Sequence, residues 1–497
     1  MSDHGRKQVA ALEPQVVWSI FAEMTAIPRP SKQEDKIREH VKQFATRHGL
    51  AVKQEPIGNL VISAPATPGR EAAALTVLQA HLDMVCEKNR DTKFDWEQDP
   101  LPVKVDTDKK TGKAIVVSEG TTLGADNGIG VAMALAVAAS KDVSHGPLEI
   151  LLTIDEEAGM SGAKALTPES FRGRRLINLD SEEDDALYIG CAGGCDTNLT
   201  WKFAASPAES SSEVCRLVVE GLRGGHSGCD IHEGRANAIR LLARTLTGTN
   251  IAGIRLGEVV GGSKRNAIPR EAHALVSGAT GLRKALEEAA KIVRDECAAE
   301  SFEPDIRICV EHVPRGDAGD FVPANDSRRL LQAIVALPSG VIAMHPRVPG
   351  LVQTSNNIST IEFRSGEKEA SYIVGLLSRS SSDSMLEFTK CQLASIGRLS
   401  GAEITNANQY PGWEPNPDSP LLATCKRIYE HLFQTPPKVS AIHAGLETGI
   451  IGKLVGNVDM VSLGPTIQGA HSPEERVFIE SVGKSWKLLT AILKELN

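Results

Sequence analysis

Three short apolar runs that end on histidine or acidic residues constrain this chain more than any other feature. The runs are ALTVLQAHLD (residues 74–83), LEILLTID (148–155) and RLINLD (175–180). Runs that are apolar at nearly every position are typical of strands buried on both faces of a sheet. They alternate with stretches of helical spacing at residues 32–49 and 124–140. The pattern predicts an α/β fold with a three-layer α/β/α core, in which catalytic groups gather where strands end.

The character of the sequence changes in the middle of the chain. From about Tyr188 to Arg398 amphipathic strands alternate with longer helices, which predicts an inserted α+β (ferredoxin-like) unit of two related β-α-β halves. The α/β pattern then returns and closes with a helix within residues 475–497. We therefore expect a catalytic domain formed by residues 1–187 and 399–497, with a lid domain of residues 188–398 inserted between its two parts.

Composition excludes several classes of protein. The formal net charge is -9 and no basic run is present, which argues against a nucleic-acid partner. No segment approaches the roughly 20 apolar residues of a membrane span, and the first residues lack the pattern of a signal peptide. The 9 cysteines are odd in number and lack the spacing of a disulfide scaffold. We expect a cytoplasmic protein with reduced thiols and no membrane contact.

Acids and histidines at the expected strand ends form a candidate metal centre. The set comprises His81, Asp126, Glu157, Asp180 and His471. Mixed imidazole and carboxylate donors suit zinc or a similar first-row metal, and this number of donors suits two ions better than one. If Asp126 bridges, each ion receives one histidine, one terminal carboxylate and the bridge, and a shared position remains for water.

Two further acids stand beside these candidates. Asp83 follows His81 by two positions, so strand alternation places both side chains on one side, where the carboxylate could fix the orientation of the ring. Glu156 precedes Glu157 and would project differently, free to take a proton from the bridging water and pass it to a leaving amine. Each pair taken alone is more typical of a structural contact or a solvated turn; the ordered set favours a hydrolytic centre.

The chain resembles the co-catalytic di-zinc exopeptidases, the family that includes carnosinases, aminoacylases and carboxypeptidase G. The similar motifs are AHLDMVCEKN (80–89), TTLGADNGIGVAMALA (121–136), TIDEEAGMSGA (153–163), LINLDSEE (176–183), GGHSG (224–228) and GPTIQGAHSPEE (464–475). HLDMVCEKN, HAGLETG (443–449) and YPGWEPNPDSPLL (410–422) look more narrowly like the dipeptidases of this family that cleave aminoacyl-histidine substrates. The resemblance runs over nearly the whole chain, in the same order.

The resemblance implies a particular division of the metal ligands. One metal would be held by Asp126, Glu157 and His471, and the other by Asp126, His81 and Asp180. The implied cofactor is two Zn²⁺ ions, for which Co²⁺ or Mn²⁺ could substitute.

The same resemblance implies roles for the neighbouring residues. Asp83 would support the histidine ligand before it, and Glu156 would be the general base. A cis peptide bond is expected between Asp126 and Asn127. Relatives that act on substrates with a free amino group tend to have Asp rather than Glu at the position matched by Asp180. Asp180 therefore favours a substrate with a free amino group.

The inserted unit resembles the lid of the family and supplies further candidates. His226 would polarise the scissile carbonyl and stabilise the oxyanion, Asn266 would make a polar contact, and Arg379 would bind the substrate carboxylate. Arg379 could instead be an ordinary surface residue, and His232 and His443 could be structural or surface imidazoles. A lid of this size resembles the type in which the lid histidine comes from the same chain as the metal ligands. A homodimer stays an open alternative.

Together these features predict a metal-dependent dipeptidase that hydrolyses unblocked dipeptides by a metal-bridging hydroxide with Glu156 as base. Xaa-His dipeptides, including β-alanyl-histidine, are the expected substrates. Two alternatives stay open: an aminoacylase or carboxypeptidase acting on N-blocked substrates, and a non-catalytic metal- or peptide-binding protein.

Overall fold

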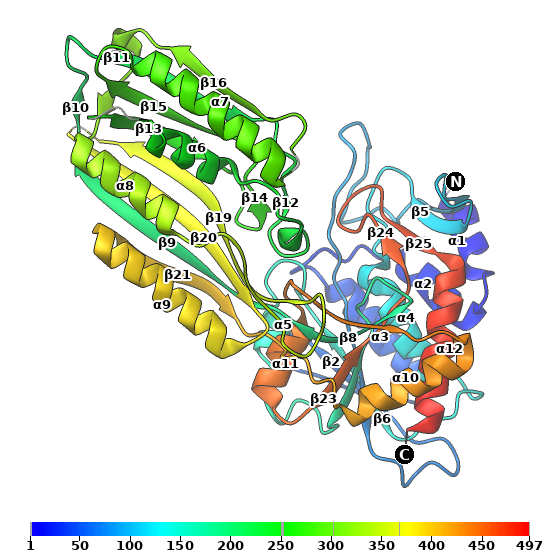
Figure 1. The fold of residues 1–497 in the computed structure, drawn as a ribbon. Helices are drawn as coiled ribbons and strands as arrows, with labels where there is room; N and C mark the ends of the chain where they lie inside the picture. Colours follow the sequence, from blue (N-terminus) through cyan, green and yellow to red (C-terminus); the bar gives the residue numbers. More distant parts are fainter. Residues whose placement is uncertain (1, 250–252, 302, 367, 497) are drawn as a thin grey trace. The chain divides into compact units, whose positions relative to one another are not determined.

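The computed structural model describes residues 2–249, 253–301, 303–366 and 368–496 of the chain. Its internal contacts divide the protein into two units, which are described separately (Figure 1). Unit 1 comprises Met1–Gly190, Pro415–Ala441 and Leu446–Asn497, and unit 2 comprises Cys191–Glu414 and Ile442–Gly445. The first unit is therefore completed by the C-terminal part of the chain, after the second has been inserted.

Unit 1 combines helices with a large sheet and a small one. Its helices are α1 (Ser2–Ala10), α2 (Gln15–Met24), α3 (Asp35–Arg47), α4 (Ala125–Ala139), α5 (Ser161–Lys164), α10 (Pro420–Phe433), α11 (Glu447–Val455) and α12 (Ile479–Glu495). Its strands are β1 (Ala51–Gln54), β2 (Leu60–Ala64), β3 (Thr76–His81), β4 (Val103–Thr107), β5 (Ala114–Ser118), β6 (Leu148–Thr153), β7 (Arg175–Asn178), β8 (Ala186–Cys191), β22 (Lys438–Ile442), β23 (Asp459–Ser462), β24 (Ile467–Gln468) and β25 (Arg476–Phe478).

The eight-stranded sheet of unit 1 runs in the order β1-β2-β6-β3-β7-β23-β8-β22. Its centre is parallel: β3 pairs with β6 and β7, and β7 pairs with β23, all in the same direction. The register places His81 opposite Thr153, at the end of both strands. Since parallel neighbours end at the same edge of a sheet, the segments that follow β6, β3 and β7 come together there.

Both faces of the central strands are covered. Every residue of β3 and β6 is buried. Leu78 and Ala80 point into the core formed with α2, α4 and α12, whereas Gln79, on the opposite face, donates to Glu447 of α11 over 2.7 Å. Unit 1 thus has helices on both sides of a mixed sheet, and the predicted α/β class is confirmed.

Local sequence signals set several helix ends. The Ser419 side chain accepts the N–H of Leu422 at the start of α10, and Pro420 occupies the first helical position. Helix α3 ends two residues before Gly49, whose φ of 67° is readily adopted by glycine. This end agrees with the helical spacing found in the sequence over residues 32–49.

Unit 2 is built mainly from one long antiparallel sheet and four α-helices. Its strands are β9 (Gly193–Ala204), β10 (Ser206–Pro207), β11 (Glu213–Glu220), β12 (Gly225–His226), β13 (Arg255–Gly261), β14 (Ala267–Ile268), β15 (Ala272–Gly278), β16 (Arg307–His312), β17 (Asp320–Phe321), β18 (Gly340–Met344), β19 (Val352–Ser365), β20 (Glu369–Ser380) and β21 (Glu403–Tyr410). Its α-helices are α6 (Ala238–Thr247), α7 (Leu282–Ser301), α8 (Ala324–Ala336) and α9 (Asp383–Ser400).

The long sheet consists of two β-α-β-β-α-β halves. Strands β11, β13, β15 and β16 with α6 and α7 form one half, in the spatial order β16-β11-β15-β13. Strands β9, β19, β20 and β21 with α8 and α9 form the other, in the equivalent order β21-β9-β20-β19. Each order is that of a ferredoxin-like unit, and the halves join where Gly261 of β13 pairs with Ile361 of β19. The sequence predicted a single ferredoxin-like unit of two β-α-β halves, whereas the structure contains two such units, each with the full β-α-β-β-α-β order.

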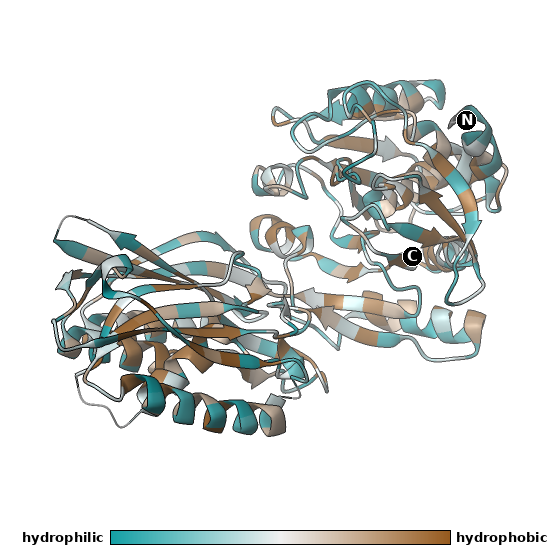
Figure 2. Ribbon diagram, turned by 90° about the horizontal axis from the view of Figure 1, so that it is seen from above, coloured by the Kyte–Doolittle hydropathy of each residue, from teal (hydrophilic) through white to brown (hydrophobic). Residues whose placement is uncertain are grey.

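The helices of unit 2 are amphipathic, and Figure 2 shows them banded in hydrophilic teal and hydrophobic brown. Strand β21 pairs with β9 throughout most of its length, from Glu403 opposite Thr200 to Tyr410 opposite Gly194. The inserted unit therefore continues to Glu414, beyond the limit at residue 398 expected from the sequence. No helix among the described residues is long and apolar enough to cross a membrane.

We predict that Ile150→Ala destabilises unit 1 far more than Ile57→Ala does. Ile150 is fully buried in β6, whereas Ile57 lies in the turn after β1 with 41% of its surface exposed. Truncating the buried side chain should lower the free energy of unfolding by about 2–5 kcal/mol, because it removes apolar burial and leaves a cavity. Urea unfolding followed by circular dichroism measures both variants; equal losses of stability would contradict the burial assigned to β6.

Candidate metal centre

The candidate ligands of unit 1 lie at the shared edge of its parallel strands. His81 is the last residue of β3, Glu156 and Glu157 lie in the loop after β6, and Asp180 lies two residues after β7. Three groups of these side chains place their ligand atoms within 4.8 Å of one another. The groups are His81, Asp126 and Asp180; Asp126, Glu157 and His471; and His81, Glu156 and Glu157.

Asp126 joins the first two groups. Its Oδ1 lies 3.2 Å from His81 Nε2, and its Oδ2 lies 3.3 Å from His471 Nε2. His81 Nε2 is also 3.2 Å from Asp180 Oδ1, and His471 Nε2 is 3.0 Å from Glu157 Oε2. One carboxylate thus presents an oxygen to each of two histidines, and each histidine faces one further carboxylate. The bridging role suggested for Asp126 requires such an arrangement and stays a prediction.

The main chain around Asp126 departs from a regular helix. Helical geometry is interrupted at Asp126, with ψ 112°, and the Asp126–Asn127 peptide bond is cis, as expected from the sequence. The Asn127 side chain donates to the carbonyl oxygen of Leu179 over 2.8 Å. This hydrogen bond ties the Asp126 turn to the residue that precedes Asp180.

Asp83 supports the centre mainly through the loop that carries the glutamates. Its carboxylate accepts the backbone N–H groups of Glu156 at 3.0 Å and Glu157 at 3.1 Å, and the hydroxyl of Ser31 at 2.7 Å. His81 Nδ1 lies 3.2 Å from the backbone carbonyl oxygen of Asp83 and 3.5 Å from its carboxylate. Burial alone would raise the pKa of Asp83, but the neighbouring His81 and, after it, the hydrogen bonds from Ser31 and the Glu156 N–H lower it to about 2.

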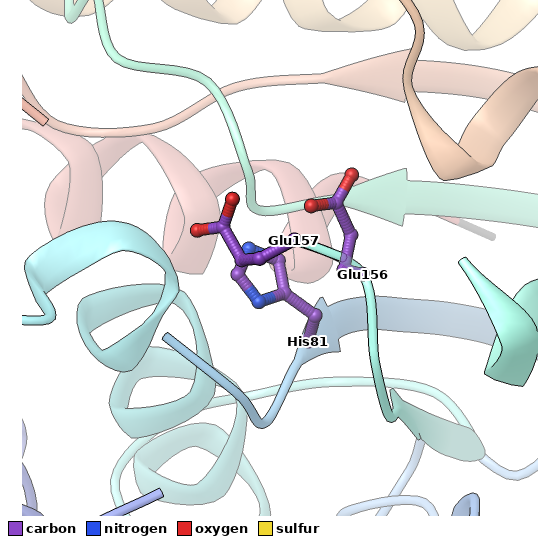
Figure 3. Close-up of side chains that lie close together, drawn as sticks. All are labelled: His81, Glu156 and Glu157. Atoms are coloured by element: carbon purple, nitrogen blue, oxygen red, sulfur yellow. The ribbon is translucent and has the colours of Figure 1, made fainter. Parts of the chain in front are cut away.

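Glu156 and Glu157 are adjacent in sequence but point to different sides of the His81 ring, as Figure 3 shows. Glu157 Oε2 faces His471, and its Oε1 is buried with no hydrogen-bond partner among the described residues. Glu156 is close enough to His81 and Glu157 to be a ligand itself, so its geometry fits either a ligand or a base. Burial and the nearby carboxylates raise the pKa of Glu156 well above its ordinary value.

The cluster strongly favours positive charge. Hydrogen bonds with Asp126 and Glu157 raise the pKa of His471 to about 11. Burial, reinforced by the charges of Asp126 and Glu157, raises the pKa of Asp180 to about 6. An excess of carboxylate over imidazole, together with the unpartnered Glu157 oxygen, fits divalent cations held by nitrogen and oxygen donors.

The other candidates lie in unit 2, and three of them gather around Gly228. A Cβ atom at Gly228 would lie 2.1 Å from His443 O, 3.0 Å from His226 Cε1 and 3.2 Å from Arg379 Nε, so only glycine fits there. His443 is buried and its Nε2 lies 2.7 Å from the hydroxyl of Ser355. Burial and the charge of Arg379 lower the pKa of His443 to about 3, which keeps this ring neutral.

His226 is held in one tautomer by its neighbours. Its Nδ1 accepts the backbone N–H groups of Gly228 at 3.2 Å and Cys229 at 2.9 Å. An Nδ1 that accepts leaves the proton of the neutral ring on Nε2. Burial and the charge of Arg379 lower the pKa of His226, so the ring is neutral and Nε2 is a donor.

Arg379 is not a surface residue, since only 5% of it is exposed. Its Nη1 donates to the hydroxyl of Tyr410 over 2.8 Å, and its Nε is buried without a hydrogen-bond partner among the described residues. Asn266 is exposed just before β14, beside the residue that pairs with His226, and His232 is also exposed.

Sequence reasoning did not single out Ser31, Ser355 or Tyr410. The hydroxyls of Ser31 and Ser355 contact candidate residues from distant segments, and neither lies in a motif quoted from the sequence. Tyr410 is the first residue of the YPGWEPNPDSPLL motif. The motif therefore pointed to this residue, but the sequence did not show that its hydroxyl contacts Arg379.

With this geometry established, the family follows from comparison with known proteins. The chain matches the model of peptidase family M20/M25/M40 over residues 77–495. It is 41% identical over 496 residues to the cytosol non-specific dipeptidase of Escherichia coli strain K12, covering 98% of this chain and 99% of that relative. The chain belongs to peptidase family M20/M25/M40, and the resemblance seen in its motifs is confirmed.

Solved structures agree with this assignment. The crystal structure of an aminoacylhistidine dipeptidase from Vibrio alginolyticus matches with a TM-score of 0.88 and 40% identity, covering 98% of each chain. A tripeptidase from Staphylococcus aureus is 15% identical with a TM-score of 0.58, covering 98% of this chain and 99% of that one. The second likeness shows a shared fold alone.

We predict that Asp83→Ala weakens metal binding by about 10- to 100-fold, an effect typical of residues that orient ligands. Its carboxylate holds the backbone of Glu156 and Glu157, so its loss should release both side chains. Calorimetric titration of the metal-free protein with Zn²⁺ measures the change, and Asp91→Ala, at an exposed position nearby, is the matched control. Unchanged Zn²⁺ affinity in Asp83→Ala would show that the loop keeps its shape unaided.

Proposed function

We propose that this protein is a metal-dependent dipeptidase that cleaves unblocked dipeptides, with Xaa-His dipeptides preferred. The proposal rests mainly on the position of Asp126. One of its carboxylate oxygens faces His81 and the other faces His471. The names of the Escherichia coli and Vibrio alginolyticus relatives support dipeptide and aminoacyl-histidine substrates. A cytoplasmic location is supported by the name of the first, and a homodimer stays a prediction.

The proposed cofactor is a pair of Zn²⁺ ions, one held by His81, Asp126 and Asp180 and one by Asp126, Glu157 and His471. The three-residue groups within 4.8 Å support both sets, because each combines imidazole and carboxylate donors. When bound, such ions lower the pKa of a water molecule and polarise a peptide carbonyl. The residues around them would supply proton transfer and orientation.

Glu156 is the proposed general base. Its side chain diverges from that of Glu157 (Figure 3), and Asp83 fixes the backbone of both residues. A raised pKa makes a carboxylate a stronger base, which favours taking a proton and passing it on to the leaving amine. Asp83 is then a positioning residue that aims the base and keeps its neighbour in place.

The unit 2 cluster is proposed to bind the substrate. His226 would donate its Nε2 proton to the oxygen of the scissile carbonyl, as its tautomer allows. Arg379 would bind the C-terminal carboxylate, since its buried Nε is an unused donor and Tyr410 fixes the plane of the guanidinium. His443 and Asn266 would provide neutral polar contacts to the same substrate.

Hydrolysis of three histidine compounds separates the candidate activities. We expect the Zn²⁺-loaded protein to cleave alanyl-histidine and to leave N-acetyl-histidine intact. The rate on β-alanyl-histidine, whose amino group lies one carbon further from the scissile bond, measures how far the site tolerates a displaced amine. Free histidine released with time is the measurement, and a chelator should abolish it. Cleavage of N-acetyl-histidine alone would indicate an aminoacylase, and silence on all three despite bound Zn²⁺ would indicate a binding protein.

The role of Glu156 is tested by Glu156→Ala. If Glu156 is the base and not a ligand, this variant should lose at least about 10²-fold in turnover, as is typical for a lost proton-transfer group, while it still binds two Zn²⁺ ions. Alanyl-histidine hydrolysis and the Zn²⁺ content after gel filtration are the two readouts. Loss of Zn²⁺ together with activity would assign Glu156 to the ligands.

A further inference from the structure

The segment that carries His471 also delivers a buried carboxylate to the turn that carries Asp126. Glu475 lies four residues after His471, and only 2% of it is exposed. Its carboxylate accepts four consecutive backbone N–H groups: those of Leu123 at 2.7 Å, Gly124 at 2.9 Å, Ala125 at 2.7 Å and Asp126 at 3.3 Å. One side chain thus holds the main chain up to the bridging aspartate.

The turn before α4 lacks a capping side chain of its own. The N-cap residue is Gly124, in the left-handed region at φ 66°, and Asp126 interrupts the helical geometry in the first turn. The first N–H groups of a helix have no partner within the helix, and an N-cap side chain usually accepts some of them. Glu475 takes this place from a position about 350 residues away in the sequence.

A buried arginine holds the other side of the same turn. Arg29 is fully buried, and its Nη2 donates to the carbonyl oxygen of Gly124. A Cβ atom at Gly124 would lie 2.5 Å from this Nη2 and 2.7 Å from Met84 Sδ, so the packing is close. The turn is therefore fixed through its N–H groups by Glu475 and through a carbonyl by Arg29.

His471 depends on its own segment for support. Its side chain is 54% exposed and its backbone has φ 62°, a conformation that costs energy for a residue with a side chain. Directly after Glu475, Arg476 begins β25, which pairs with β5. By contrast, the His81 side chain is 1% exposed and completes a strand paired on both sides.

We infer that Glu475 is a positioning residue that holds the segment of His471 and the turn of Asp126 at a fixed distance from each other. Its loss should weaken metal binding at the Asp126, Glu157 and His471 group much more than at the His81, Asp126 and Asp180 group. In the group with His81 and Asp180, these ligands lie at the ends of buried strands. The group with Glu157 and His471 relies instead on an exposed histidine, whose segment is held in place by Glu475. This inference rests on the proposed function, since it takes both groups to be metal sites.

The test is a stepwise Zn²⁺ titration of metal-free wild type, E475Q and E475D by calorimetry. Gln keeps the size of the side chain but turns an N–H₂ group toward backbone donors, whereas Asp keeps the charge and both acceptors on a shorter stem. We expect two Zn²⁺ ions in wild type, one affinity lowered by about 10- to 100-fold in E475Q with the other nearly unchanged, and partial recovery in E475D.

The control is E474Q, which removes the same charge from the neighbouring exposed residue and should bind Zn²⁺ as wild type does. Circular dichroism checks that each variant is folded; if E475Q is unfolded, the selective loss must appear in E475D. Two unchanged affinities, or two affinities lowered equally, would overturn the inference alone. A wild-type protein that binds no Zn²⁺ would overturn the proposed function and the inference with it.

Discussion

The mutual repulsion of four acids gathered around two histidines is the constraint on which unit 1 depends. These acids, Asp126, Glu156, Glu157 and Asp180, lie within ligand distance of His81 or His471. Bringing like charges together at a largely buried site is costly: burial, and after it the charges of Asp126 and Glu157, raise the pKa of Asp180 to about 6. The two imidazoles offset only part of the negative charge, and divalent cations would offset the rest. The fold must hold these side chains together against their repulsion.

It does so through the main chain. Asp83 accepts the backbone N–H groups of the loop that carries Glu156 and Glu157, and Glu475 accepts those of the turn that carries Asp126. Each of these two acids follows a histidine of the centre, by two and four positions. A segment that contributes an imidazole therefore also fixes a loop that contributes carboxylates. Such supporting contacts orient ligands in a way that the ligand list alone does not reveal.

Much of this could be read from the sequence because the signals are local. Apolar runs that end at or just before His81, Glu157 and Asp180 predicted buried strands, and the parallel pairing of these strands confirmed that the run ends meet. The limit at residue 398 was less predictable, because β21 joins unit 2 by pairing with β9, some 200 residues earlier. No local pattern specifies a strand partner that far away. For the same reason Tyr410, which contacts Arg379, was quoted within a motif but not assigned a role.

The sequence by itself determined the residue types, their order and the elements that carry them, since periodicity and strand-end chemistry depend on neighbours in the chain. It also indicated the family and a bridging role for Asp126. Only the tertiary structure decided which atoms meet. It shows that the Asp83 carboxylate lies closer to the backbone of the loop with Glu156 and Glu157 than to the His81 ring, and that His226 keeps its proton on Nε2. The Asp83 contact joins segments that are far apart in the sequence, and the His226 contact depends on the conformation of the turn that follows the ring, so residue order alone does not specify either geometry.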